Sequence, residues 1–467
     1  MIKSLKLRNF RSIRSSELAF SESGISVVVG ANGSGKSNLI KAIQFLSQIA
    51  REDLDSAVDA QRGVDAMLPK ALRLPELRTV MCTLESSHQL FRPEWYPRDA
   101  PDLHIEHAIS FGRDRNISAG IRHERLLFAA PLAVQFFESL SEQAHQISLG
   151  MALLPQALTH SMFEIERYAD DDLAIKTSPS FTENRDGFLN WLGLPFFGND
   201  QEMDLSSLGA ILQSFNRSSS RNPESAGRLE SWLSQKGTQP LPFCTEANTF
   251  RRLLSDIRHY DFQLTRLRQE QERSATTSMA FDGQGLPTVI RRLREGREGP
   301  VKWQRVAATM QAIAPHVFDA TVSRLSTGKE FVRFIESRTG RPVESWESSD
   351  GTLRALAILA AIETHGDHGT VLIEEPEHGL HPWAVRVLMD HLRETVAARG
   401  IQVITTTHSQ QVLDAAHPRE VIVASRDADQ GTVFRRVIDM IPEGQLSHGG
   451  LGRLWVQGLL GGVPTYE

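Results

Sequence analysis

The residues best suited to chemistry are Lys36 and Ser37, which close the run Gly30-Ala-Asn-Gly-Ser-Gly35. The spacing Gly-x4-Gly-Lys-Ser is that of a phosphate-binding loop, in which backbone N–H groups surround the phosphates of a nucleotide. In such a loop the Lys36 ammonium would reach the β- and γ-phosphates, and the Ser37 hydroxyl would ligate Mg²⁺. We predict that the loop binds a nucleoside triphosphate through Asn32, Gly33, Ser34, Gly35, Lys36, Ser37 and Asn38.

A second reactive group is acidic and lies far down the chain. The apolar run 371–373 is followed by Glu374-Glu375-Pro376-Glu377. Carboxylates at the carboxyl end of a strand beside a phosphate loop can hold Mg²⁺ and position water. We assign Glu374 to the metal and Glu375 to the general base that polarises the attacking water. The alternative interpretation is an exposed acidic turn.

Two further candidates stand next to predicted elements. His408 follows the run 401–406, where it could donate a hydrogen bond to the γ-phosphate; a structural histidine is the alternative. Ser349 or Asp350 could cap the apolar helix expected over 353–362, and the start of that helix would be a second anion site. Ordinary helix capping is the alternative for this pair.

These candidates need a scaffold that brings them together. The β-branched run 25–29 predicts a buried strand before the loop, and apolar residues at 39, 40, 43 and 46 predict a helix after it. The runs 369–374 and 401–406 are typical of parallel strands buried on both faces. Between them, residues 382–399 open with proline and stop at Gly400, which predicts a complete helix.

The remaining patterns divide the chain into three parts. Short β-rich runs between about 77 and 130 predict an antiparallel sheet, so residues 1–130 form the first part. Residues 131–258 become helical and loop-rich, which predicts an inserted, mostly helical domain. Regular α/β patterning then resumes over 259–467. The sequence therefore predicts an α/β fold whose parallel core is closed from both ends of the chain.

Composition sets limits on the class of protein. The 467 residues carry a net charge of −6, are 40% hydrophobic and include two cysteines. No apolar run approaches the roughly 18 residues of a membrane helix, no signal peptide opens the chain, and a disulfide framework is excluded. We expect a soluble, cytoplasmic protein that does not bind membranes. The His-x-x-His pairs lack further ligands, so zinc is not expected.

One basic cluster could bind a nucleic-acid backbone. Arg291, Arg292, Arg294, Arg297 and Lys302 lie close together in the sequence. Glutamates at 295 and 298 alternate with them, so a solvated helix face is the alternative.

Taken together, the motifs resemble ABC-class ATPases of the SMC, RecF and OLD type. In that family a Ser-Asp-Gly or Ser-Gly-Gly signature precedes an apolar helix, as Ser349-Asp350-Gly351 does here. The resemblance also covers the phosphate loop, Asn9-Phe-Arg-Ser12, Ile373-Glu-Glu-Pro-Glu377, Leu380-His-Pro382, Thr406-Thr-His-Ser409, Tyr260, Asp282-Gly-Gln-Gly-Leu286 and Ile313-Ala-Pro315. It implies an ATPase head with a mixed sheet, a parallel core and an antiparallel β-subdomain.

The resemblance also implies a composite site. Two heads of this family meet face to face around two ATP molecules, so Ser349, Asp350 and Gly351 would act in trans, and Arg11 would touch the nucleotide in cis. ATP and Mg²⁺ are the implied cofactors. Glu374 replaces the usual aspartate, and Asp350 replaces a frequent glycine; both variants look like a RecF/OLD-like subgroup. No residue stands out as the glutamine that usually senses Mg²⁺.

Full OLD proteins also contain a TOPRIM nuclease domain, and Asp427-Ala-Asp429 could be its acidic pair. Only about forty residues follow, and residues 421–437 are typical of a β-hairpin with Asp-Gln-Gly at its turn. We therefore expect a nuclease, if there is one, on a separate chain.

Three functions remain open from the sequence. The first is an ATPase that dimerises through its heads and drives DNA repair or anti-phage defence, with DNA as a possible ligand and a separate effector such as a TOPRIM or HNH nuclease or another toxin. The second is an ATP-gated oligomeric scaffold that sequesters a toxic effector without binding DNA. The third, a transporter motor, is disfavoured by the long β-rich and then helical stretch between loop and signature.

Overall fold

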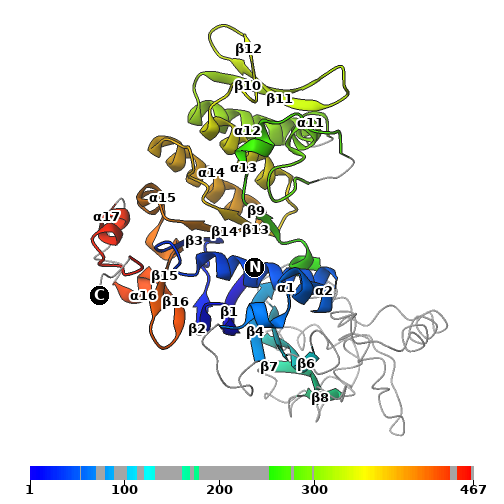
Figure 1. The fold of residues 1–467 in the computed structure, drawn as a ribbon, viewed down its shortest axis with the longest axis vertical. Helices are drawn as coiled ribbons and strands as arrows, with labels where there is room; N and C mark the ends of the chain where they lie inside the picture. Colours follow the sequence, from blue (N-terminus) through cyan, green and yellow to red (C-terminus); the bar gives the residue numbers. More distant parts are fainter. Residues whose placement is uncertain are drawn as a thin grey trace, which may run out of the picture. The chain divides into compact units, whose positions relative to one another are not determined.

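The computed structural model describes residues 1–52, 54–69, 79–88, 103–112, 120–131, 160–168, 173–177, 252–274, 278–296, 299–441 and 450–463. Figure 1 shows the helices and strands in chain order, and the described residues belong to two compact units. The first contains Met1, Leu18–Lys41 and Asp256–Glu467, and the second contains Ile2–Glu17 and Ala42–Ser255. Each unit is described by itself below.

The first unit is built on a largely parallel sheet. Its strands run in the order β16-β15-β3-β14-β13-β9. Neighbouring pairs from β15 to β9 are parallel, and β15 with β16 forms the predicted antiparallel hairpin. The bounds are β3 Ile25–Val29, β9 Arg258–Tyr260, β13 Thr370–Glu374, β14 Gln402–Thr407, β15 Val421–Asp427 and β16 Gly431–Arg436.

The three central strands are almost completely buried. Every residue of β3 and β14 is buried, as is every residue of β13 before Glu374. Their register pairs Val29 with Thr407 and Thr406 with Glu374, so the carboxyl ends of the three strands meet at one edge. This edge is where the reactive candidates gather.

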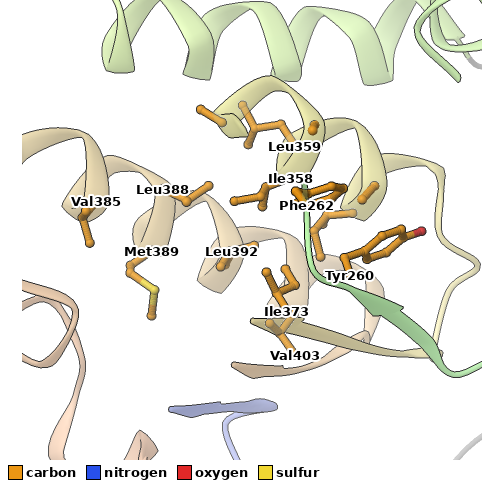
Figure 2. Packing of buried hydrophobic residues seen from close by; sticks show 14 of the residues in the cluster. Tyr260, Phe262, Ile358, Leu359, Ile373, Val385, Leu388, Met389, Leu392 and Val403 are labelled. Carbon is orange, nitrogen blue, oxygen red and sulfur yellow. The ribbon is translucent and has the colours of Figure 1, made fainter. Parts of the chain in front are cut away.

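Helices complete the core of the first unit. The nine residues Leu353–Ala361 of α13 are fully buried apart from Arg354, and this helix packs with α14 above β13 and β14 (Figure 2). The many alanines of α13 allow close approach, while each fully buried Leu or Ile contributes about 1.5–3 kcal/mol. The other bounds are α1 Lys36–Arg51, α10 Leu264–Arg268, α11 Leu286–Glu295, α12 Gly299–Ile313, α13 Asp350–Thr364, α14 Pro382–Arg399, α15 Gln410–Ala415, η4 Pro418–Glu420, α16 Val437–Met440 and α17 Leu451–Val456.

A small antiparallel sheet, which the sequence patterns did not predict, follows α12. It consists of β10 Val317–Arg324, β11 Glu330–Glu336 and β12 Pro342–Glu344, in that spatial order. Phe334 and Val332 on β11 join the main hydrophobic core.

The second unit contains the antiparallel sheet expected for the N-terminal part. Its strand order is β8-β7-β6-β5-β4-β1-β2, and Phe45 on the second half of α1 lies between Phe10 and Phe111 with ring centroids 6.2 and 5.2 Å away. The bounds are β1 Ile2–Phe10, β2 Ile13–Ala19, α2 Leu54–Ala60, α3 Val64–Met67, β4 Thr79–His88, β5 Leu103–Gly112, β6 Gly120–Pro131, β7 His160–Tyr168 and β8 Leu173–Thr177.

The predicted helical segment, residues 131–258, is helical at residues 252–255 but contains two strands elsewhere. Residues 160–168 form β7, which pairs with β6, and residues 173–177 form β8. Alternation of Phe163 and Ile165 with Glu164 and Glu166 is a strand pattern, and β6 offers the backbone partners that the strand needs. The helix prediction is wrong for these two stretches, and the antiparallel sheet extends beyond the boundary predicted at residue 130. Most of the segment lies outside the described residues.

The expected combination of a parallel core and an antiparallel β-region is confirmed. Among the helices that the structure describes, none has the length and apolar character needed to cross a membrane.

Candidate nucleotide site

The phosphate loop leaves β3 and enters α1 as predicted. Gly33 and Gly35 both have positive φ, of 76° and 108°. At residue 35 an added Cβ would also lie only 2.2 Å from Thr432 Oγ1. Glycine is therefore required there by both conformation and space.

Three contacts from distant segments hold the loop in shape. Thr432 on β16 donates its hydroxyl to Ser34 O (2.8 Å), and Arg426 on β15 donates Nε to Gly33 O (3.1 Å). The N–H of Ala31 donates to Gly462 O (2.6 Å), which lies after α17. The sequence predicted the hairpin but gave no signal that its residues, or the Gly461-Gly462 pair, would touch the loop.

Lys36 lies within the loop. Its ammonium donates to Gly30 O (2.6 Å) and Ala31 O (3.1 Å), and only 9% of the residue is exposed. Burial lowers the pKa of Lys36, although the nearby glutamates oppose this shift. A cation that is poorly hydrated and held by neutral carbonyls is suited to exchange those contacts for phosphate oxygens.

Ser37 and Glu374, the predicted metal ligands, are brought together from opposite ends of the chain. Ser37 Oγ donates to Glu374 Oε2 at 3.2 Å. The other carboxylate oxygen lies 2.8 Å from Nε2 of His259, the middle residue of β9. Burial alone would raise the pKa of Glu374, but the hydrogen bonds of His259 and Ser37 and the charge of Lys41 lower it overall. The two oxygen donors suit a hard cation such as Mg²⁺.

His259 is a site residue that sequence reasoning missed. It precedes Tyr260 on the strand beside β13. Tyr260 is one of the residues on which the family resemblance rests, whereas His259 is not. Its ring is stacked with that of Phe281, with centroids 6.5 Å apart. Only the parallel pairing of β9 with β13 brings this imidazole to Glu374.

Glu375 and His408 also lie side by side. His408 Nδ1 is 3.1 Å from Glu375 Oε1, and His378 Nδ1 is 3.5 Å from Oε2. Glu375 has a φ of 47°, the left-handed conformation, and its N–H donates to Thr406 O at 2.9 Å. The structure thus brings these two side chains together, and the roles predicted for them stay predictions.

Glu377 is a third acid at this edge. Its Oε1 accepts a hydrogen bond from Thr407 Oγ1 (2.5 Å), and its Oε2 is buried without a hydrogen-bond partner among the described residues. Burial raises the pKa of Glu377. A carboxyl group in this setting holds a proton more readily than Glu374 does.

The signature residues open α13. Ser349 is the N-cap: its Oγ accepts from Thr352 N at 3.2 Å. Asp350 forms an ion pair with Arg268, which neutralises the charge that set this signature apart. Ser349 and Asp350 are exposed, whereas Gly351 is buried against the loop that follows β13. Capping is thus observed; action in trans stays a prediction.

Asn32, Asn38 and Arg11 are the remaining predicted site residues. Asn32 is exposed at the apex of the phosphate loop, and Asn38 lies within α1. Arg11 belongs to the second unit, where its Nη2 donates to Gln61 Oε1 at 2.6 Å. Its predicted contact with the nucleotide stays a prediction.

Two residues of the basic cluster, Arg291 and Arg294 on α11, make structural contacts. Arg294 forms an ion pair with Asp319 (2.8 Å) and lies over the Trp303 ring, 5.0 Å from its centroid. Arg291 lies 3.5 Å from Glu330. These contacts engage two side chains of the cluster within the fold, whereas Arg297 lies outside the described residues.

Comparison with known proteins yields two family matches. Residues 1–76 match the family described as "AAA ATPase domain". Residues 242–414 match the family described as "AAA domain, putative AbiEii toxin, Type IV TA system". The first contains the phosphate loop, and the second contains the signature, the acidic strand and His408.

One curated relative and several solved structures are similar to parts or all of the chain. The "Old nuclease" of Escherichia phage P2 is 32% identical over 119 residues, which are 23% of this chain and 20% of that protein. The chain thus spans about a fifth of this relative. The "SMC head domain from Thermotoga maritima" is 12% identical, with 93% of this chain and 98% of that chain covered and a TM-score of 0.39. An SmcHead bound to the C-winged helix domain of ScpA is 13% identical, with 94% and 99% covered and the same TM-score.

Proposed function

We propose that this chain, which carries an ATPase domain of the ABC, SMC and OLD-like type, binds ATP with Mg²⁺ and hydrolyses it. The observation that carries the proposal is the meeting of Lys36, Ser37, Glu374, Glu375 and His408 at one edge of a parallel sheet. These residues come from three separate stretches of sequence. Their joint presence at one edge is expected of a hydrolytic nucleotide site and of few other structures.

Each residue would have a defined task. Lys36 would bind the β- and γ-phosphates, while the Ser37 hydroxyl and the Glu374 carboxylate would hold the metal ion. Bound Mg²⁺ would neutralise charge on the phosphates. Glu375 would accept the proton of a water molecule as its oxygen attacks the γ-phosphorus and the bond to the β–γ bridging oxygen breaks, which yields ADP and phosphate. His408 would donate a hydrogen bond to the γ-phosphate.

We further propose that two heads close around two nucleotides. Ser349 and Asp350 are exposed at the start of α13, where they are accessible to a second copy. The nucleotide held by one copy would then be capped by the other. Dimerisation of this kind would serve DNA repair or anti-phage defence, with a nuclease or another toxin as a separate effector.

The competing function is an ATP-gated scaffold that cages a toxic partner without binding DNA. The ion pairs of Arg291 and Arg294 favour it, because they engage two of the basic side chains that could have bound a nucleic-acid backbone.

One set of measurements tests these proposals. ATPase rate and oligomer size are measured for the wild type, Lys36→Ala and Glu375→Gln, each with and without double-stranded DNA. We expect hydrolysis by the wild type, loss of nucleotide binding in Lys36→Ala, and an ATP-dependent, enlarged and inactive species in Glu375→Gln. Nucleotide binding by Lys36→Ala would refute the site. Hydrolysis that requires DNA would exclude the scaffold.

A further inference from the structure

Arg354 is a buried arginine one turn into α13, and neither the motifs nor the chemistry above assigns it a role. It is only 6% exposed. Its Nη1 donates to the carbonyl oxygen of Glu375 at 3.0 Å, and its Nη2 donates to Phe262 O at 2.5 Å. The side chain thus connects the signature helix to the backbone of the proposed general base.

The Glu375 backbone needs such a partner. A non-glycine residue in the left-handed region costs about 1–2 kcal/mol, so surrounding contacts must hold it there. Three hydrogen bonds do so: the N–H of Glu375 donates to Thr406 O, and its C=O accepts from the Arg354 side chain and from the N–H of His378 (3.2 Å). This conformation directs the carboxylate toward His408.

A second contact ties the same two segments together. At Gly351 a Cβ atom would lie 2.2 Å from Gly379 O, so the start of α13 packs directly on the loop that follows Glu375. With Arg354 one turn further on, the signature helix and the loop 375–381 are joined at two points. A displacement of one segment is therefore transmitted to the other.

We propose that Arg354 is a positioning residue that holds Glu375 in its active backbone conformation. Through this contact, binding of the signature to the nucleotide of a second copy would control how well Glu375 activates the attacking water. This inference rests on the proposed ATPase function. When Ser349 and Gly351 cap a nucleotide on a second copy, the position of α13 is fixed, and Arg354 transmits that position to the Glu375 carbonyl. Hydrolysis would then be fast only in a closed dimer.

The test is Arg354→Lys, which keeps the charge but cannot donate to two carbonyl groups in a fixed fork. We expect ATP affinity and KM to stay within about twofold of wild type, because Lys36 and Ser37 are untouched, and kcat to fall about 100-fold, as for a slightly misplaced catalytic group. The matched control is Arg399→Lys. Arg399 is similarly buried and also donates to backbone carbonyl groups, those of Ile362 and His365, but it does not contact Glu375. The kcat of the Arg399→Lys variant should equal that of the wild type.

A double variant separates positioning from a merely structural effect. If Arg354 acts through Glu375, Arg354→Lys combined with Glu375→Gln should hydrolyse ATP no more slowly than Glu375→Gln alone. An unchanged kcat in Arg354→Lys, or multiplicative losses in the double variant, would overturn the inference while leaving the ATPase proposal intact. A wild type that does not hydrolyse ATP would instead refute the proposed function.

Discussion

Two clusters of charged side chains in the first unit use similar residues in different ways. At the far end of α13, Glu363 is completely buried and accepts hydrogen bonds from Arg305 Nε (3.0 Å) and Nη2 (2.6 Å). Arg399 Nη1 and His391 Nε2 each lie 3.7 Å from its carboxylate. Two arginines thus surround one acid.

At the sheet edge that carries the candidate nucleotide site, acidic side chains outnumber basic ones. Glu374, Glu375 and Glu377 gather there, and the nearby Lys36 donates to backbone carbonyl oxygens. One oxygen of Glu377 is buried and lacks a hydrogen-bond partner among the described residues. Buried polar groups are normally satisfied, so an unpaired carboxylate oxygen adds nothing to the stability of this edge. The Glu363 cluster, in contrast, serves stability.

Removing the Glu363 carboxylate should give the largest effect. Glu363→Ala would leave Arg305 and Arg399 without their buried partner, which we expect to destabilise the first unit by about 3–5 kcal/mol. A urea titration followed by tryptophan fluorescence measures the shift in midpoint. Glu394→Ala, an exposed change on α14, is the control. If the urea midpoint of Glu363→Ala were the same as that of Glu394→Ala, the structural interpretation of the cluster would be wrong.

Glu375→Gln, in contrast, should lower the ATPase rate and leave the stability unchanged. Loss of the proposed general base is expected to lower kcat by about 100-fold or more, since the amide cannot accept the water proton. The urea midpoint should stay near that of wild type because Glu375 is partly exposed. Steady-state phosphate release measures the rate, with the exposed α11 variant Glu295→Gln as control. Full activity in Glu375→Gln would remove Glu375 from the mechanism.

At the candidate nucleotide site, His259→Ala should have a smaller effect than Glu375→Gln. Without the imidazole, Glu374 loses the partner at its Oε1, and we expect about a 10-fold increase in the Mg²⁺ concentration that gives half-maximal ATPase activity. His259→Gln, which can still donate a hydrogen bond, should recover part of this loss. A Mg²⁺ titration that is identical in all three proteins would contradict a role for His259 at the metal.

The smallest effect concerns pH and His365. Burial is the main cause that lowers the pKa of His365 to about 4, with Asp256 opposing and Arg258 and Arg399 adding to the shift. The unfolded chain therefore binds this proton more tightly, and the stability due to neutral His365 is lost as the pH falls below about 6.5. His365→Asn should lessen the difference between urea midpoints at pH 7 and pH 5. An unchanged difference would argue against the buried neutral imidazole.

Local sequence predicted the parts of the site that depend on neighbours in the chain. The loop Gly30–Ser37, the strand before Glu374 and the helix from Pro382 to Arg399 all appear at the expected positions. Their signals are local: glycine spacing, β-branched runs and helix stop residues. The strands β7 and β8 were missed because their stability depends on pairing with strands outside their own stretch of sequence: β7 pairs with β6, and β8 pairs with β7.

The sequence by itself determined the chemistry at the core of this protein: a phosphate loop, an acidic strand end, a signature and a histidine, each written in contiguous residues. Only the tertiary structure decided which distant groups complete them. His259 reaches Glu374 through strand pairing, Gly462 reaches Ala31 from beyond α17, and Arg354 reaches the Glu375 carbonyl from the signature helix. Such contacts leave no local pattern, because they depend on how separate segments pack rather than on spacing along the chain.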